Sequence, residues 1–249
     1  MFTKIADSVR AGFPYVSQSS TCLSSAKWLL VLASVLLAVA LLLFLPALFD
    51  GHDTATPISI LMFAAVPIAT LYAVSPDKGA GLFRTLTFKV IGQSIGFGVL
   101  TFVLSMCCAL LMTQLIDTTA NPGIHGLEAL SGGQQIRFFA LTVPQLFGEE
   151  VITILPFLAI LYFCQQRLHC SQTKAVLLAW IITALWFALI HLPTYNWNFL
   201  QVLWGIGFAR ILLTLAYIIT KNLWVSTGAH ITNDWLMFAI AILSSSYQG

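Results

Sequence analysis

Charged residues are scarce in this sequence. Only 11 Lys and Arg and 9 Asp and Glu occur among 249 residues, so 8% of the chain is charged, against roughly 25% in a soluble globular protein. This scarcity excludes a large soluble domain, and a net charge of +2 excludes the basic footprint of a nucleic-acid-binding protein. A hydrophobic fraction of 59% and a mean hydropathy of +0.91 instead indicate a polytopic membrane protein.

Several common site signatures are also absent. The five cysteines include no CxxC pair, and the chain contains neither a glycine-rich phosphate loop nor an HExxH helix. Glycines such as those of "GFGVL" and "GIG" are expected to serve helix packing. Any chemistry must therefore come from polar residues inside the apolar segments.

The apolar runs predict an all-α transmembrane bundle, because a membrane-spanning helix needs about 20 apolar residues. We expect about seven spans, or eight if one escapes separation, near 28–48, 58–75, 90–116, 137–163, 174–191, 197–219 and 222–244. Basic residues recur in every second connection, which predicts a cytoplasmic N-terminus. The expected domains are a cytoplasmic tail at 1–27 and one transmembrane domain at 28–249, with its polar motifs at 137–244.

Six ionisable residues fall inside the predicted spans. A charged side chain at the bilayer centre costs about 2.5–3.5 kcal/mol on insertion scales, so such residues are functional candidates by default. Residue counts from the helix ends put all six in one central slab, with His191 and His230 about 13 Å apart along the membrane normal. These residues are Glu149, Glu150, His191, Arg210, His230 and Asp234.

Local spacing refines this set. His230 and Asp234 are four residues apart and share a helix face. Glu149 and Glu150 diverge by about 100° around a helix, so one can face a reaction while the other supports it. Pro193 ends the helix just beyond His191.

Three blocks, "EEVITI", "FALIH" and "HITND", stand in this order and resemble the motifs of the CPBP intramembrane proteases. That family, also called Abi or CAAX-protease-like, includes the Ras-converting CAAX prenyl endopeptidase, and its motifs read EExxxR, FxxxH and HxxxN or HxxxD. The resemblance covers about the last 100 residues. Its matching positions are Glu149, Glu150, Phe187, His191, His230 and Asp234.

One motif position differs. The arginine of EExxxR is replaced by Ile154. Arg210 is available either to replace that charge or to pair with Asp234, and the sequence does not choose between these roles.

The resemblance implies an endopeptidase that hydrolyses a membrane-associated protein or peptide. In the favoured mechanism, a Glu with His191 beside it activates a water molecule without a metal. His230 with Asp234 then stabilises the oxyanion or protonates the leaving amine. In the alternative, Zn²⁺ is held by candidates among His191, His230, Glu149 and Glu150.

The resemblance further implies a bacterial cell membrane protein acting in peptide maturation or bacteriocin self-immunity. A non-catalytic scaffold of the same fold and a proton-coupled transporter are the other classes that bury such residues. The sequence lacks the two repeated halves that are typical of such transporters. The substrate and the oligomeric state are not readable from the sequence.

Overall fold

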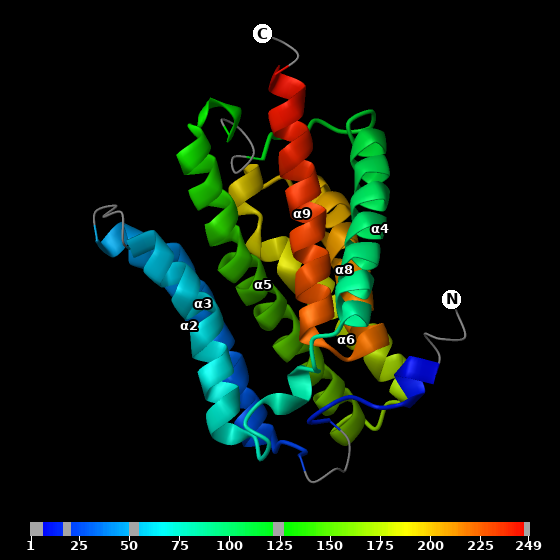
Figure 1. Cartoon of the computed structure of the whole chain (residues 1–249). Coiled ribbons are helices and arrows are strands. Elements are labelled where there is room, and N and C mark those ends of the chain that lie inside the picture. Colours follow the sequence, from blue (N-terminus) through cyan, green and yellow to red (C-terminus); the bar gives the residue numbers. More distant parts are fainter. Residues whose placement is uncertain (1–6, 17–20, 50–54, 122–126, 247–249) are drawn as a thin grey trace.

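The chain folds entirely as helices within the part that the computed structural model describes, residues 7–16, 21–49, 55–121 and 127–246. These residues contain no strand, which confirms the predicted all-α class. Figure 1 shows the long helices packed side by side and running alternately up and down. They are α2 (Ser25–Leu48), α3 (Ala55–Val74), α4 (Phe88–Met112), α5 (Gly132–Gln166), α6 (Gln172–Ile190), α8 (Phe208–Thr220) and α9 (Leu223–Ser246).

Six segments of the described chain are long and apolar enough to cross a membrane. Five are α2 to α6, and the sixth is Phe199–Thr220, in which α7 (Phe199–Gln201), the π-helical segment η4 (Val202–Gly207) and α8 follow one another. The helix α9 lies outside this set, yet it packs against α4, α5 and α8 in the same bundle. The predicted count of about seven is consistent with six spans plus α9.

Capping residues explain why several helices begin before their apolar runs. Ser24 and Thr87 cap α2 and α4, each accepting a bond from a backbone N–H three residues later. Ser131 and Gln134 form a capping box that starts α5 five residues before the predicted 137–163 span. Helix ends depend on such single polar contacts, so these helices begin two to five residues before the predicted apolar spans.

The helix α5 is the central element of the bundle. Its 35 residues correspond to about 52 Å of helix, longer than the roughly 30 Å hydrocarbon core. Its apolar window is 78% buried, whereas the windows of the other spans are at most 50% buried. The helix continues through Pro144 and Pro156 and contacts α2, α3, α6, α8 and α9. The acidic pair that it carries therefore lies inside the protein.

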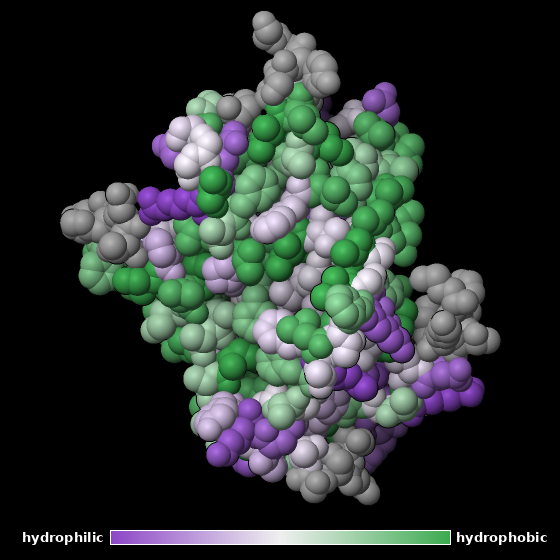
Figure 2. All heavy atoms as spheres, viewed as in Figure 1, coloured by the Kyte–Doolittle hydropathy of each residue, from purple (hydrophilic) through white to green (hydrophobic). Residues whose placement is uncertain are grey.

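Apolar side chains cover the middle of the visible surface, while hydrophilic ones gather towards its lower and upper ends (Figure 2). Leucines of α2, such as Leu36 and Leu37, are also exposed on the outside of the bundle. An apolar belt between polar ends suits a lipid bilayer. The chain is accordingly an integral membrane protein.

The basic connections meet at one end of the bundle. Lys27 donates to the carbonyl of Val74, Arg84 donates to that of Lys221, and Arg167 donates to the hydroxyl of Ser25. These contacts confirm that basic residues of alternate connections share one end, as the charge pattern predicted. The side of the membrane on which this end lies stays a prediction.

Part of the predicted N-terminal tail is packed against this end. Ser8 donates to the carbonyls of Ile218 and Ile219, and the rings of Phe13 and Phe157 lie 5.4 Å apart. Residues 1–6 and 17–20 of the tail lie outside the described residues. The described part therefore joins the helical core, while its cytoplasmic location stays a prediction.

Glycines set the position of α9 against α4. A Cβ on Gly98 would lie 2.4 Å from the Cβ of Thr232, and one on Gly228 would lie 2.6 Å from the hydroxyl of Ser94. Such separations are shorter than van der Waals contact, so these helices approach closely only because both positions lack a side chain. The predicted packing role of "GFGVL" is confirmed at Gly98. The close contact between α4 and α9 also fixes the position of His230 along the bundle, because His230 lies on α9.

Candidate functional site

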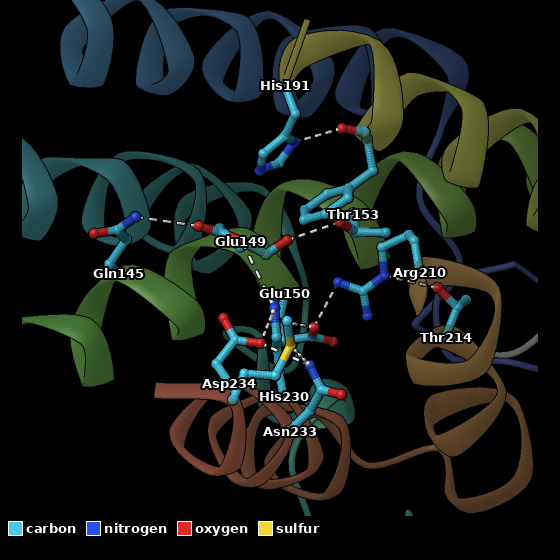
Figure 3. A network of polar contacts seen from close by, with 12 residues as sticks. Gln145, Glu149, Glu150, Thr153, His191, Arg210, Thr214, His230, Asn233 and Asp234 are labelled. Atoms are coloured by element: carbon cyan, nitrogen blue, oxygen red, sulfur yellow. Dashed lines mark hydrogen bonds and ion pairs between the residues drawn. The ribbon is translucent and has the colours of Figure 1, made fainter. Parts of the chain in front are cut away.

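The acidic pair of α5 faces the interior between α6, α8 and α9 (Figure 3). The Glu150 side chain is fully buried, while that of Glu149 keeps 12% of its surface exposed. Gln145, one helical turn earlier, donates to Oε1 of Glu149 at 3.3 Å. The two acids therefore differ in environment, as expected from their divergence around the helix.

Glu150 forms a buried ion pair with Arg210 of α8. Nη1 of Arg210 lies 2.6 Å from Oε1 of Glu150, and both side chains are fully buried. Nε of Arg210 donates to the hydroxyl of Thr214 at 3.2 Å, which fixes the guanidinium from its other side. Of the two partners left open by the sequence, Arg210 contacts the acidic pair of α5.

His230 lies between the two glutamates. Its Nδ1 donates to Oε1 of Glu150 at 2.9 Å, and its Nε2 points towards Oε2 of Glu149 at 3.8 Å. Nε2 is also 3.7 Å from Oδ1 of Asp234, one turn along α9. The predicted shared face of His230 and Asp234 is thus observed, and the imidazole joins α5 to α9.

Three carboxylates therefore surround one imidazole. Glu149, Glu150 and Asp234 carry three negative charges when ionised, against one positive charge on Arg210. A protonated His230 adjacent to all three reduces this imbalance and presents an N–H donor on both sides of the ring. In that protonated form the Nε2–H points between Glu149 and Asp234.

Asn233 orients the carboxylate of Asp234. Its Nδ2 donates to Oδ1 of Asp234 at 2.8 Å. The Asn233 side chain is buried, whereas that of Asp234 remains 22% exposed. Asn233 therefore holds a candidate site residue in place.

Phe187 joins the remaining parts of the site. Its ring centroid lies 4.6 Å from that of His191, 6.3 Å from that of His230 and 5.0 Å from the Arg210 guanidinium carbon. Both histidines thus pack near one ring, closer together than the 13 Å depth difference estimated from residue counts. Residue counts locate each side chain only to within about 5 Å, and the two histidines lie closer together than the central value of the estimate.

His191 occupies the C-cap of α6. Its Nδ1 lies 2.7 Å from the carbonyl of Phe187, and a carbonyl only accepts, so Nδ1 carries the proton. In this tautomer the lone pair of the ring lies at Nε2. In Figure 3 this ring lies above Glu149 and apart from the Glu150–Arg210 pair. His191 therefore has an acceptor available for chemistry as well as the helix-end position.

Tyr195 was not singled out from the sequence. It ends the short helix η3 (Pro193–Tyr195), is 7% exposed and bonds to the side chain of Asn121. Burial, and then the carboxylates of Asp234 and Glu149, raise the pKa of Tyr195 to about 12. A protonated phenol near the acids is another donor at the site, and its only sequence signal was its place just after Pro193.

The residues present do not form a zinc site of the expected kind. Zinc needs three protein ligands at about 2.0–2.2 Å, and among the described residues no group of three or more His, Cys, Asp and Glu can hold a metal ion. Glu150 Oε1 is engaged by Arg210 and His230, and Nδ1 of His230 is engaged by Glu150, so these atoms are not free to bind a metal ion. No step is therefore assigned to a metal.

Comparison with known families bears on the same segment. Residues 133–236 match the family model described as type II CAAX prenyl endopeptidase Rce1-like. No curated protein and no solved structure matched the chain. The matched segment contains the three motifs, all five predicted site residues and Arg210. The resemblance inferred from the motifs is thus confirmed.

Proposed function

We propose that this chain, whose residues 133–236 belong to the type II CAAX prenyl endopeptidase Rce1-like family, is an intramembrane endopeptidase that hydrolyses a membrane-associated protein or peptide. The family supports a CAAX-type intramembrane protease in general terms. The residue roles below are our proposal and rest on the geometry around His230.

The gap at Nε2 of His230 is the observation that carries the mechanism. Nε2 is 3.8 Å from Oε2 of Glu149 and 3.7 Å from Oδ1 of Asp234, too far for direct hydrogen bonds. A water oxygen about 2.8 Å from two of these atoms fits such separations. Two carboxylates therefore converge on Nε2 of His230 without bonding to it directly.

Glu149 is the general base in this proposal. Its carboxylate takes a proton from a water molecule, and the water oxygen attacks the scissile carbonyl carbon. The Nε2–H of His230 donates to the resulting oxyanion. The proton held by Glu149 then passes to the leaving nitrogen as the C–N bond breaks, giving a carboxylic acid and an amine.

Glu150 is unsuited to the role of base because its Oε1 is engaged by Arg210 and His230. Its role is to fix the ring of His230, so that Nε2 points towards Glu149. His191, with its lone pair at Nε2, assists the water from the α6 side. Asp234 approaches the same nitrogen of His230 from α9, and the charges of Asp234 and Glu149 act on Tyr195 of η3.

The substrate is expected to approach from the side of the partly exposed acids. Glu149 and Asp234 keep 12% and 22% of their side-chain surface exposed, whereas Glu150 and Arg210 keep none. A membrane-associated substrate is consistent with the position of these acids inside a helical bundle. The family description suggests a prenylated CAAX peptide as the first compound to test.

The test uses purified protein in liposomes with an internally quenched CAAX peptide, either farnesylated or unmodified. We expect cleavage of at least one peptide, lowered about 10²–10⁴-fold by His230→Gln, since acid–base and oxyanion contributions have this size. His191→Ala should also lower the rate strongly.

The matched control is His169→Asn. His169 is exposed in the α5–α6 connection, and Asn tolerates its φ of 50°. This variant should retain the wild-type rate. Equal rates in the wild type, the two site variants and the control would refute the proposal, and preferential cleavage of the farnesylated peptide would identify the lipid as part of recognition.

A further inference from the structure

The arginine beside the acidic pair comes from a different helix than the motif predicts. Position 154 lies four residues after Glu150, so an arginine there would share its helix face and reach its carboxylate. Here position 154 is a fully buried isoleucine in the apolar core. The cation that meets Glu150 belongs instead to Arg210, 60 residues further along the chain.

We propose that Arg210 supplies, from α8, the positioning charge that the EExxxR motif places at position 154 of α5. The proposal rests on the proposed function, because it assigns Arg210 a role in orienting His230 for catalysis. Arg210 acts through Glu150 and touches no reacting atom.

The contacts form a single path from Arg210 to the reacting nitrogen. The guanidinium holds Oε1 of Glu150 at 2.6 Å, and the same oxygen accepts from Nδ1 of His230 at 2.9 Å. A ring fixed at Nδ1 has its Nε2 fixed as well. Removal of the guanidinium would free the Glu150 carboxylate to rotate and leave its buried charge with His230 alone.

Arg210 is itself held from three sides. Nε donates to Thr214, Nη1 meets Glu150, and the guanidinium carbon lies 5.0 Å from the centre of the Phe187 ring. The planar guanidinium faces the carboxylate with Nη1 and the hydroxyl with Nε, which a lysine ammonium cannot do in the same geometry, and Nη2 has no hydrogen-bond partner among the described residues. These contacts indicate that Arg210 positions the Glu150 carboxylate in addition to balancing its charge.

The segment η4 sets the direction in which Arg210 points. Its π-helical turns end at Gly207, three residues before Arg210. An extra residue in a helix rotates everything after it by about 100° relative to an uninterrupted α-helix. The π-helical turns thus orient α8 so that Arg210 faces the site.

The test moves the arginine between the two positions. Arg210→Ala removes the guanidinium and leaves its space, and Ile154→Arg in the same chain restores a cation one turn from Glu150. The matched control is Ile152→Arg with Arg210→Ala, because Ile152 is equally buried but lies about 200° from Glu150 on α5. The farnesylated and unmodified quenched peptides serve as probes, and thermal unfolding in detergent is measured in parallel.

We expect Arg210→Ala to lower kcat at least about tenfold with KM within about twofold, since Arg210 does not touch substrate. Ile154→Arg should recover most of kcat and the unfolding midpoint, and Ile152→Arg should recover neither. An unchanged kcat in Arg210→Ala, or equal recovery by both relocated arginines, would overturn the proposal.

The unfolding measurement distinguishes a failure of the proposed function from a failure of the proposal about Arg210. If the wild type cleaves neither peptide, the proposed function fails, yet recovery of the midpoint by Ile154→Arg alone still supports the relocated charge. If cleavage is present but Ile154→Arg leaves both kcat and the midpoint at the Arg210→Ala level, the relocated-charge proposal fails by itself.

Discussion

Replacing each glutamate by glutamine should separate a catalytic acid from a structural one. Glu149 keeps one neutral hydrogen-bond donor, Gln145, and is partly exposed. Glu149→Gln should therefore lower kcat about 10²–10⁴-fold, the contribution of a general base. Its effect on the free energy of unfolding should stay near about 1 kcal/mol, the net value of one hydrogen bond.

Glu150→Gln should act mainly on stability. It leaves the guanidinium of Arg210 buried with a neutral partner, and removing one member of a buried ion pair costs about 3–5 kcal/mol. At about 2–4 °C per kcal/mol for a chain of this size, the unfolding midpoint should fall by about 6–20 °C. Activity should also fall, because His230 loses the charged acceptor at Nδ1.

The assay is thermal unfolding in detergent together with peptide cleavage in liposomes. A double variant, Glu150→Gln with Arg210→Met, removes both charges and should regain part of the lost stability, because a buried pair replaced by neutral groups is often near neutral. The division of roles would be refuted if Glu149→Gln lowered the midpoint as far as Glu150→Gln, or if Glu149→Gln retained the wild-type kcat.

Two further predictions concern the metal and the basic end of the bundle. The purified protein should carry less than one zinc per chain and keep its activity in chelator, and one tightly bound zinc whose removal and return abolish and restore cleavage would contradict this. Burial, and then Arg84, lower the pKa of Lys221 from 10.5 to about 7. Between these values the unfolded chain binds the proton and the folded chain does not, so stability should rise with pH from about 7 to about 10.5. Lys221→Met should remove that rise in unfolding midpoints measured across this range, and an equal slope in both proteins would contradict the assignment.

Much of the fold followed from the sequence because membrane helices are encoded locally. Each apolar run must satisfy its own backbone, so its length predicts a helix. Helix starts were less predictable, since they depend on single capping residues such as Ser131. The packing of Ser8 and Phe13 on the helix ends was also not foreseen, because it involves contacts between residues about 150 to 210 positions apart.

The residues that form the site were easier to predict from the sequence than the contacts among them. Glu149, Glu150, His230 and Asp234 come together as their motif spacing suggested, and His191 lies near them through Phe187. Their roles stay predictions. The partner of Arg210 could not be chosen from sequence because it depends on the rotation of α8, and the π-helical turns of η4 that set this rotation have no periodicity signal.

The site divides into a fixed part and an open part, and this division explains why so many acids are tolerated there. Contacts from Arg210 through Glu150 to Nδ1 of His230 are 2.6 and 2.9 Å long and fully buried at the ion pair. Contacts on the other side of the ring, to Glu149 and Asp234, are 3.8 and 3.7 Å long and partly exposed. Short buried contacts hold the imidazole in one orientation, while the longer contacts leave room for a reacting molecule without moving the ring. Because the buried carboxylate is paired with Arg210 and the other two are only partly buried, their charges can persist inside the bundle. A site built this way can keep its donor and base in position before substrate arrives, which is what stabilising a developing oxyanion requires.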